Sequence, residues 1–568
     1  MELDALIAAL GRGRAYGTDA PVEVIQTHIS VVFLVGDEVF KIHKPVDFGF
    51  LDFRQLDARR RDCEAEVEVN RELAPGVYRG VVAVVRRGDQ VAIARELEPS
   101  DEPSDEVVEW AVWMRRLPDS ATFHSLLERG ALDSAALERL AETLAEFYQA
   151  GSAHAAAHPQ QQRLGDLATV RANAVENFTQ LDALAAAVTS AGAEPPIDPS
   201  LLARLREHTE AELARLGPRI HARWEAGAIR DTHGDLRLDH VYALDRVDPS
   251  EATRAGPELL AATGGRSLLI IDRIEFTDRF RWADPIADVA FLLMDLEARG
   301  AWSLAAEFAA AFFAASGLDR DRAEATALLR FYAGYRATVR AKIAAMTAAE
   351  PEVSSEARAA ARTKAAARTR LALASLAPPS QRPCLVLVAG LPGTGKSALA
   401  RALVDAAGFT WVRSDALRKR LAGLDPWTSR AAGVGEGLYT PEWTERTYAA
   451  CLDRAGEVCR AGGRAVVDAT FVDHRRRETF VAAAIEWGVP TLLLVATAPA
   501  ELVRDRIEAR TRDPSDATWA VYEAASARWR PADPQLCRVA EIDTRGSLDE
   551  SAAQVLQALA DAGLGQPS

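Results

Sequence analysis

A glycine-rich motif two-thirds of the way along the chain most strongly constrains its fold. Residues 390–397 read Gly-Leu-Pro-Gly-Thr-Gly-Lys-Ser and directly follow the apolar run 385–389. Glycines in this order let backbone N–H groups curl around phosphate oxygens, and a helix predicted over 398–407 adds its positive N-terminal dipole. The motif therefore predicts a nucleotide-binding loop between a buried strand and a helix. Its residues are Gly390, Leu391, Pro392, Gly393, Thr394, Gly395, Lys396 and Ser397.

The chemistry of this loop assigns roles to its last two residues. Lys396 is expected to reach the β- and γ-phosphates of ATP, and the Ser397 hydroxyl to bind Mg²⁺. Two acids follow further along the chain, Asp415 at a strand-to-helix junction and Asp468 at the end of an apolar strand. Strands of an open parallel sheet bring such residues to one edge. We expect Asp468 to hold the water shell of Mg²⁺ and Asp415 to activate an acceptor hydroxyl.

Residues 504–512 place four arginines on a predicted helix and the loop after it. Beside a phosphate-binding loop, such cations close over a transferring phosphoryl group and neutralise its charge. We assign this role to Arg510, and the alternative is a solvated, salt-bridged helix face. The region resembles the group of polynucleotide kinases, zeta toxins and chloramphenicol phosphotransferases, including their Ser-Asp-x-x-Arg pattern at 414–418. The resemblance implies a kinase.

The domain organisation is predicted from the chain length and from the positions of helix-breaking prolines. A chain of 568 residues is too long for one hydrophobic core. Residues 377–383 contain three prolines and predict a linker between domains 1–376 and 384–568. Residues 341–376, rich in Ala and Arg, predict one or two long solvated helices. We expect a C-terminal α/β P-loop NTPase domain with a parallel sheet, and an N-terminal α+β domain with two lobes, a small lobe at about 1–108 and a helical lobe at about 109–376.

Periodicity predicts the elements of the N-terminal part. Residues 22–44 alternate as strand, turn at Gly36-Asp37, and strand, which is typical of a hairpin. Helical spacing extends over 61–73, 106–147, 166–184 and 201–224. Short strands are predicted at 81–85, 91–96 and 268–272.

Two polar clusters stand out in this N-terminal part. Residues 233–242 contain Asp235 after a turn, and residues 268–276 contain Asp272 after an apolar strand. A hydroxyl kinase needs one carboxylate to accept or orient the proton of the nucleophile and another to hold Mg²⁺. The first cluster resembles the H-G-D-x-x-x-x-N catalytic loop of aminoglycoside phosphotransferases. The resemblance implies that Asp235 is the catalytic base, that Asp272 binds Mg²⁺, and that Asp288 braces the catalytic loop.

The same resemblance implies a protein-kinase-like small lobe. Its phosphate-binding lysine is Lys41, on the second strand of the hairpin, with Lys44 as the alternative. Glu66 is the expected ion-pair partner, with Glu64 as the alternative. By order along the chain, residues 110–114 correspond to the segment that contacts adenine.

One position departs from the family pattern. His240 lies where a metal-binding Asn is expected, and imidazole is a poor ligand for Mg²⁺, which prefers oxygen. Either His240 still belongs to the metal set, or Asp239 or water replaces the Asn, or one metal site is lost. A loop histidine held by hydrogen bonds is the alternative role for His240. The phosphate-covering turn, residues 27–30, also lacks the glycine-rich pattern.

Taken whole, the chain resembles a bacterial family of predicted bifunctional kinases, an aminoglycoside-phosphotransferase-like domain fused to a P-loop kinase. The resemblance implies ATP binding and phosphoryl transfer, but no particular substrate. We expect ATP and Mg²⁺ as cofactors and a hydroxyl of a small molecule as the acceptor. One alternative is an N-terminal lobe that binds nucleotide or metabolite and only regulates the P-loop kinase. A nucleic-acid-end kinase is a further alternative, but residues 382–568 carry 23 Lys and Arg against 24 Asp and Glu, with no basic excess.

The remaining composition points to an ordinary reduced protein. Five cysteines form no C-x-x-C pair, so buried thiols are expected. The first residues lack a basic stretch followed by an apolar one, and no run approaches the length of a membrane span. We therefore expect a cytoplasmic protein with no membrane partner, and the sequence does not indicate an oligomeric state.

Overall fold

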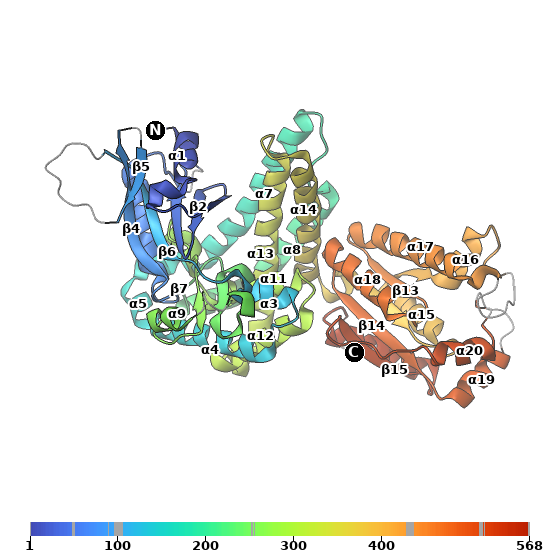
Figure 1. Ribbon diagram of the computed structural model, residues 1–568. Helices are drawn as coiled ribbons and strands as arrows, with labels where there is room; N and C mark the ends of the chain where they lie inside the picture. The colour runs from blue at the N-terminus through green and yellow to red at the C-terminus, as the bar shows by residue number, and fades with distance from the viewer. Residues whose placement is uncertain are drawn as a thin grey trace. The chain divides into compact units, whose positions relative to one another are not determined.

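The computed structural model describes residues 2–47, 51–88, 90–95, 106–251, 254, 256–427, 437–509, 515 and 517–565. The chain divides into two compact units, whose elements are labelled in Figure 1. The first unit comprises residues 1–169, 220–292 and 308–322. The second comprises residues 170–219, 293–307 and 323–568. Several of the long helices pass from one unit to the other.

The first unit begins with an antiparallel sheet. Among the described residues this sheet has six strands in the order β1-β2-β3-β6-β4-β5. The turn at Gly36-Asp37 joins β2 to β3, as expected, and a further strand, β1, precedes them. The strands are β1 (Val22–Gln26), β2 (Ser30–Val35), β3 (Glu38–His43), β4 (Tyr78–Arg87), β5 (Gln90–Ala94) and β6 (Glu106–Arg115).

Alternation along β3 positions its polar residues. Successive side chains of a strand face opposite sides of the sheet. Phe40 and Ile42 pack in one core with helix α1 (Leu3–Leu10), and Val39 packs in the other core with helix α2 (Leu56–Asn70). Lys41 and His43 lie two and four residues after Val39, so their side chains lie on the same face of the sheet, the one that α2 covers.

One expected helix is wrong in its first part. Residues 106–147 were predicted to be helical, but β6 occupies Glu106–Arg115 and pairs with both β3 and β4. Valine and tryptophan dominate this stretch, and such residues favour a pleated, buried strand over a helix. Helices begin only afterwards, with α3 (Phe123–Glu128) and α4 (Ser134–Ala150). The sheet therefore extends past residue 108, and residues 110–114 lie in its central strand.

Short elements and helices complete the first unit. Antiparallel pairs join β7 to β10 and β8 to β9, and these pairs carry the two polar clusters noted in the sequence. The strands are β7 (Arg230–Asp231), β8 (Val241–Ala243), β9 (Leu268–Ile270) and β10 (Trp282–Ala283). The helices are α5 (Ser152–Ala157), α6 (Pro159–Gln162), α9 (Pro257–Ala262) and α10 (Asp278–Arg281). Helices that pass between the units are α7 (Leu167–Ser190), α8 (Pro199–Glu225), α11 (Pro285–Glu297) and α12 (Trp302–Ala315).

The second unit contains the expected parallel sheet. Within the described residues it has five strands in the order β12-β13-β11-β14-β15, all parallel. The strands are β11 (Cys384–Ala389), β12 (Thr410–Arg413), β13 (Arg464–Asp468), β14 (Thr491–Thr497) and β15 (Arg538–Asp543). The helices around it are α15 (Lys396–Ala407), α16 (Ser414–Leu421), α17 (Pro441–Arg460), α18 (His474–Trp487), α19 (Ala500–Glu508), α20 (Trp519–Ser526) and α21 (Leu548–Asp561).

Helices cover both faces of this sheet. Leu385 and Leu387 of β11 pack with residues of α17 and α18, whereas Val386 and Val388 pack with residues of α15 and α21. Every residue of β11 is buried, which explains its unbroken apolar sequence. This three-layer arrangement leaves the carboxyl ends of the strands free to carry a site.

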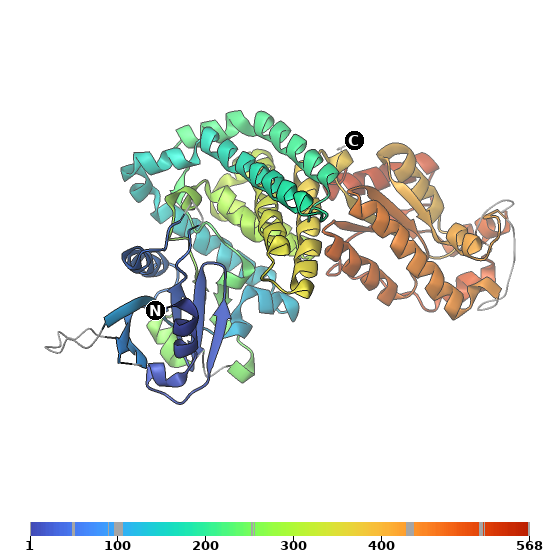
Figure 2. The same ribbon diagram turned by 90° about the horizontal axis from the view of Figure 1, so that it is seen from above.

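The helices before the sheet differ from their expected exposure. Two helices, α13 (Arg322–Ala349) and α14 (Ser355–Leu376), occupy the Ala-rich region and lie alongside each other (Figure 2). The last turns of α14 are buried, so the prediction of solvated helices was wrong there. Gly334 explains the fit, because a Cβ on it would lie 2.4 Å from Leu376 Cγ. Small alanine side chains permit this close helix packing. Because alanine is also common in exposed helices, the same residues led to the prediction of solvated helices.

Two other expectations concern cysteines and membranes. All five cysteines are buried free thiols, as predicted. Among the described residues, no helix combines the length and apolarity that a membrane crossing requires.

Candidate active sites

The phosphate-binding motif folds as the sequence predicts, a loop between β11 and α15. Gly390, Gly393 and Gly395 all have positive φ angles, of 144°, 83° and 93°. A side chain would also collide there, because a Cβ on Gly393 would lie 2.7 Å from Val503 Cγ1. Glycine is therefore required both by the backbone conformation and by the space available.

The two functional residues at the start of α15 already have defined partners. Lys396 Nζ donates a hydrogen bond to Leu391 O across the loop at 2.8 Å. Ser397 Oγ donates to Asp468 Oδ2, also at 2.8 Å, at the carboxyl end of β13. Burial raises the pKa of Asp468, while Lys396 and the hydrogen bond from Ser397 lower it. The structure thus brings together a lysine, a hydroxyl and a buried acid, the set that a Mg²⁺–nucleotide complex requires.

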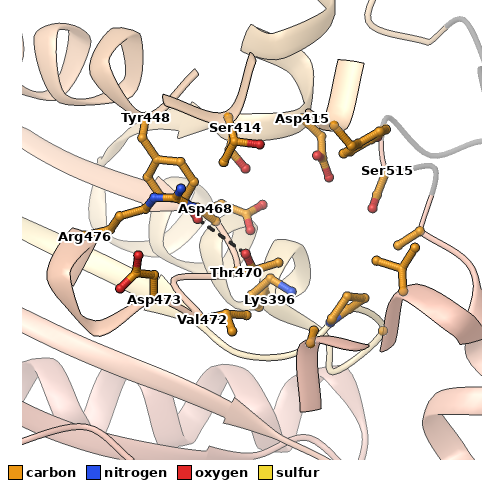
Figure 3. A pocket seen from close by; sticks show the side chains of 18 of the residues that line it. Lys396, Ser414, Asp415, Tyr448, Asp468, Thr470, Val472, Asp473, Arg476 and Ser515 are labelled. Carbon is orange, nitrogen blue, oxygen red and sulfur yellow. Dashed lines mark hydrogen bonds between the residues drawn. The ribbon is translucent and has the colours of Figure 1, made fainter. Parts of the chain in front are cut away.

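A cavity of about 680 Å³ lies against this loop. Figure 3 shows Lys396, Asp468 and Asp415 pointing into the same space. Asp415 is in the first turn of α16, directly after β12, where the sequence placed it. Asp415 therefore lines the same cavity as the phosphate-binding loop.

The opposite wall of the cavity contains residues that the sequence analysis missed. Tyr448 of α17 receives a hydrogen bond from Phe471 N at 3.1 Å, and its hydroxyl lies 3.3 Å from Thr470 Oγ1 (Figure 3). Arg476 of α18 stacks over the Tyr448 ring. Only Thr470 had a signal in the sequence, the Asp-Ala-Thr-Phe stretch directly after an apolar strand, because residues that follow a parallel strand line the ligand edge.

Of the four arginines in the expected lid, the structure describes the first two, Arg504 and Arg506. Arg506 of α19 lines the cavity and donates to Thr544 O at 2.6 Å. Arg504 stacks on Trp519 instead. Arg510 and Arg512 lie outside the described residues. Arg506 therefore lies at the cavity, and the lid role of Arg510 stays a sequence-based prediction.

In the first unit, Lys41 connects two acids that are distant in sequence. Lys41 Nζ lies 3.0 Å from Glu66 Oε1 and 3.5 Å from Asp272 Oδ1. Burial lowers the pKa of Lys41, but Glu66, Asp272 and Glu275 raise it well above its ordinary value. Glu64, the alternative partner, is exposed and pairs with Arg60 instead. The ion pair expected between Lys41 and Glu66 is present.

Asp272 has a backbone conformation that is unusual for a residue with a side chain. Its φ is +62°, in the left-handed region, and its N–H donates to the Tyr78 hydroxyl at 3.1 Å. Desolvation raises the pKa of Asp272, but the charges of Lys41 and Arg237 lower it well below its usual value. An acid held ionised in a strained conformation is a common feature of functional sites.

The loop that carries Asp235 is organised by Arg237 and His240. Arg237 Nε donates to Asp235 Oδ2 at 3.0 Å, and Arg237 Nη2 lies 2.6 Å from His240 Nε2. His240 Nδ1 lies 2.9 Å from Asp235 O. Since guanidinium only donates and a carbonyl only accepts, these contacts assign a neutral imidazole with its proton on Nδ1. Both nitrogens of His240 are thus engaged, which favours the hydrogen-bonded role of this residue.

A metal ion could still be held in this loop region. Single ligand atoms of Asp235, His240 and Asp272 all lie within 4.8 Å of one another. His240 Nε2 is 3.3 Å from Asp272 Oδ2. Asp239, the possible replacement for the missing Asn, lies close to His124 Nδ1 at 2.5 Å. Asp235 and Asp272 supply the oxygen ligands that Mg²⁺ prefers. Arg237 donates a hydrogen bond to one of them, Asp235.

Asp288 holds the same loop from behind. Its Oδ2 accepts hydrogen bonds from His233 N and from the Tyr148 hydroxyl, both at 2.8 Å. Its Oδ1 accepts from Gly234 N at 2.8 Å. The Asp288 side chain is buried, so these hydrogen bonds compensate its desolvation. The bracing contact that the sequence suggested for Asp288 is present.

Comparisons with known proteins place the whole chain in a family. A family model described as an AAA domain matches residues 385–532. The chain is 30% identical over 540 residues to the "Uncharacterized protein Rv2004c" of Mycobacterium tuberculosis (strain ATCC 25618 / H37Rv), covering 94% of this chain and 95% of that protein. The "Uncharacterized protein Mb2027c" of Mycobacterium bovis (strain ATCC BAA-935 / AF2122/97) matches with the same identity and coverage. The chain belongs to their family. The family therefore includes the part before the P-loop domain as well as that domain.

Some solved structures resemble the chain over about a third of its length. A sugar kinase from Janibacter sp. HTCC2649 is 18% identical with a TM-score of 0.26, covering 32% of this chain and 99% of that chain. A gluconokinase from Sinorhizobium meliloti 1021 is 20% identical with a TM-score of 0.24, covering 32% of this chain and 94% of that chain. TM-scores of this size transfer neither fold nor function. The P-loop identity of the second unit rests on its own geometry and on the family model.

Proposed function

We propose that the second unit is an ATP-dependent phosphotransferase that transfers the γ-phosphoryl group of ATP to a hydroxyl of a small molecule. The observation that carries the proposal is the hydrogen bond from Ser397 to Asp468 beside Lys396, where all three residues line a cavity of about 680 Å³. In P-loop enzymes a hydroxyl and a strand-end acid hold Mg²⁺, and the lysine binds the β/γ-phosphates. When bound, Mg²⁺ neutralises charge on the transferring group.

The chain's own residues then have distinct roles. Backbone N–H groups of 390–396 orient the phosphates, and Lys396 fixes the γ-phosphoryl group for attack. Asp415 accepts the proton of the acceptor hydroxyl. Arg510 is proposed to close over the phosphoryl group, with Arg506 supporting it from the described part of α19.

The charge of the cavity supports an anionic acceptor. Its lining includes Asp415, Asp468 and Asp473, against a larger number of cations. Phosphates of the nucleotide would neutralise the cations nearest the phosphate-binding loop. Arg528 and Arg530 come from a different segment, the one that follows α20. An acceptor with a carboxylate or phosphate group would match them. The cationic lining comprises Lys396, Arg413, Arg418, Arg475, Arg476, Arg506, Arg528 and Arg530.

For the first unit we propose a second phosphotransfer site of the aminoglycoside-phosphotransferase type. Lys41, paired with Glu66, would bind phosphates, Asp235 would act as the base, and Asp272 would hold Mg²⁺. The three-way contact of Lys41, Glu66 and Asp272 supports this assignment. The boundaries that accompany it, 1–376, 377–383 and 384–568, also remain proposals.

A specific observation favours a second candidate, in which the first unit binds nucleotide only to regulate the P-loop enzyme. Arg237 pairs with the proposed base Asp235 at 3.0 Å, and His240 replaces the expected metal-binding Asn. A base held by a guanidinium is poorly placed to accept a proton. A nucleic-acid-end kinase is less favoured, because the second unit has no basic excess over its acids.

The test is a phosphoryl-transfer assay on the full chain with labelled ATP and a metabolite extract. Wild type, Lys396→Ala, Asp235→Asn and the double variant are compared, and labelled products are separated. We expect Lys396→Ala to remove one set of products and Asp235→Asn another. If Asp235→Asn removes no product, the regulatory candidate replaces the second phosphotransfer site. Unchanged products in the double variant would disprove both sites.

A further inference from the structure

A second polar cluster lies next to Lys41. It consists of His43 on β3, Asp62 on α2, and Glu275 on the segment after Asp272. Single ligand atoms from these three side chains lie within 4.8 Å of one another. Three separate elements of the first unit thus direct metal-ligating groups at one point.

The atoms that meet there are buried and unsatisfied. The His43 and Glu66 side chains are each 1% exposed, and that of Asp62 is 8% exposed. His43 Nε2 is 3.2 Å from Asp62 Oδ2 and 3.8 Å from Glu66 Oε2. Within the described part of the chain, none of these three atoms has a hydrogen-bond partner. Buried polar atoms without partners are costly and rare in folded proteins, so the cluster calls for a ligand.

The imidazole is oriented as metal-binding histidines are. His43 Nδ1 lies 3.3 Å from Ser30 Oγ, within the buried sheet. This contact fixes the ring and leaves Nε2 directed at the carboxylates. Metal-ligating histidines characteristically engage their other nitrogen with a neighbouring polar group.

A divalent cation would also suit the charge balance of the cluster. Lys41 contacts Glu66 Oε1 and Asp272 Oδ1. Lys41 also acts on Asp62 and Glu275 electrostatically, but burial outweighs it and raises the pKa of each, that of Asp62 to about 7. A divalent cation would compensate both carboxylates at once.

We propose that His43, Asp62 and Glu275 bind a divalent transition-metal ion, with Glu66 Oε2 available as a fourth ligand. One imidazole nitrogen with carboxylate oxygens suits Zn²⁺ or Mn²⁺, whereas Mg²⁺ prefers oxygen alone. The ion would tie β3, α2 and the segment after Asp272 together next to Lys41. Its role is to hold the first unit in shape, and the site stands whether or not either unit transfers phosphate.

The alternative occupant of the cluster is a proton. Asp62 and Glu275 interact side chain to side chain, and two buried carboxyls can share one proton. A shared proton would leave His43 Nε2 unsatisfied, whereas a metal ion satisfies all three groups. Direct metal measurement separates the two occupants.

The experiment measures metal retention by the full chain. Protein stripped with a chelator is equilibrated with Zn²⁺ or Mn²⁺ in excess Mg²⁺, desalted, and analysed by mass spectrometry for metal per chain. The excess Mg²⁺ competes for all-oxygen sites elsewhere. We expect wild type to retain about one Zn²⁺ or Mn²⁺, and Asp62→Asn and His43→Gln to retain none.

Matched variants locate the ion. Glu64→Gln changes an exposed acid on the same helix and should retain the metal, as should Asp272→Asn at the neighbouring cluster. Ser30→Ala removes only the contact to His43 Nδ1 and should weaken metal affinity roughly 10- to 100-fold without unfolding the chain. Ser30→Ala and the wild-type titration remain decisive if a buried variant does not fold.

Three results would overturn the proposal. Wild type could retain neither metal after equilibration, which would leave the shared proton as the occupant. Asp62→Asn could retain as much metal as wild type. Finally, the metal could be lost in Asp272→Asn but not in Asp62→Asn, which would move the ion to the Asp235 cluster.

Discussion

Ser397 and Asp468 are 71 positions apart, yet the hydroxyl of one donates to the carboxylate of the other at 2.8 Å. The contact joins the first turn of α15 to the end of β13, on neighbouring parallel strands. It forms because the loop after β11 and the end of β13 open onto the same edge of the sheet. The proposed Mg²⁺–nucleotide chemistry depends on this contact.

Replacing Asp468 tests the role of this pair directly. Asp468→Asn retains a hydrogen-bond acceptor for Ser397 but removes the negative charge. Affinity for Mg²⁺–ATP should therefore fall at least tenfold, which corresponds to a loss of about 1.4 kcal/mol in binding free energy. Affinity for ATP in EDTA should change little. Calorimetric titrations with and without Mg²⁺ measure both, with Asp405→Asn on the exposed side of α15 as the control. Equal losses with and without Mg²⁺ would argue against a metal role.

Burial raises the pKa of Asp468, so Mg²⁺-dependent affinity of wild type should increase as pH rises.

Lys396→Ala removes the cation that the phosphates require. We expect phosphoryl transfer by the second unit to fall about 100-fold or more, because a preorganised charge at the transferring group is lost. Circular dichroism should be unchanged, since the Lys396 side chain donates to a carbonyl of its own loop, Leu391 O, and is not part of the hydrophobic core. The matched control, Arg401→Ala, removes an exposed cation from the same helix. Transfer by Lys396→Ala at the rate of Arg401→Ala would contradict the assignment.

Variants of Asp235 and Asp272 test the phosphotransfer site proposed for the first unit. In a Lys396→Ala background, Asp235→Asn should slow transfer by 10²- to 10⁴-fold while ATP affinity is retained. Asp272→Asn should weaken Mg²⁺–ATP binding as well, because it removes the acid next to Lys41. Initial rates and equilibrium titrations on the same preparations give both quantities. Identical rates in all three proteins would support the regulatory candidate.

His240 is predicted to act through its hydrogen bonds. His240→Asn cannot reach both Asp235 O and Arg237, so loop order and transfer rate should fall while the Mg²⁺ concentration for half-maximal rate stays the same. The measurement is rate against Mg²⁺ for wild type and variant. A variant with preserved or higher activity and a lower Mg²⁺ requirement would instead identify His240 as a poor metal ligand that Asn improves.

Acid should destabilise the first unit through His233. Burial lowers the pKa of His233 to about 4, so between pH 6.5 and 4 the unfolded chain binds a proton that the folded chain does not. Stability should therefore decrease as pH falls through this range, by on the order of 3 kcal/mol for this group. Urea unfolding from pH 5 to 7 should show a flatter dependence in His233→Gln than in wild type. His221→Gln, which changes an exposed histidine, should follow wild type.

Local patterns were most informative in the second unit. The strand Cys384–Ala389, the glycine loop and the helix from Lys396 follow from steric needs that act within a dozen residues. Asp415 and Asp468 could be placed at one sheet edge because parallel strands connected by helices end on the same side. Tyr448 was missed because it approaches the cavity from the middle of α17, where no local pattern distinguishes it from a core residue.

The first unit was harder to predict. The strand Glu106–Arg115 was read as helix because its apolar residues are too dense to show a clear period of two. A central strand buried by both neighbouring strands and by helices on its faces carries no alternation to detect. The buried end of α14 was misjudged for a related reason, since alanine is typical of both solvated and tightly packed helices.

The sequence by itself determined the P-loop, the acids at strand ends and the histidine that breaks the catalytic-loop pattern, because each follows from residue chemistry over a short span. Only the tertiary structure decided which groups meet. Glu64 and Glu66 lie about 200° apart around α2, and the packing of that helix on β3 turns Glu66 toward Lys41 and Glu64 toward solvent. The same packing directs Asp62 at His43. These contacts join residues of separate elements, and their geometry depends on how the whole core packs.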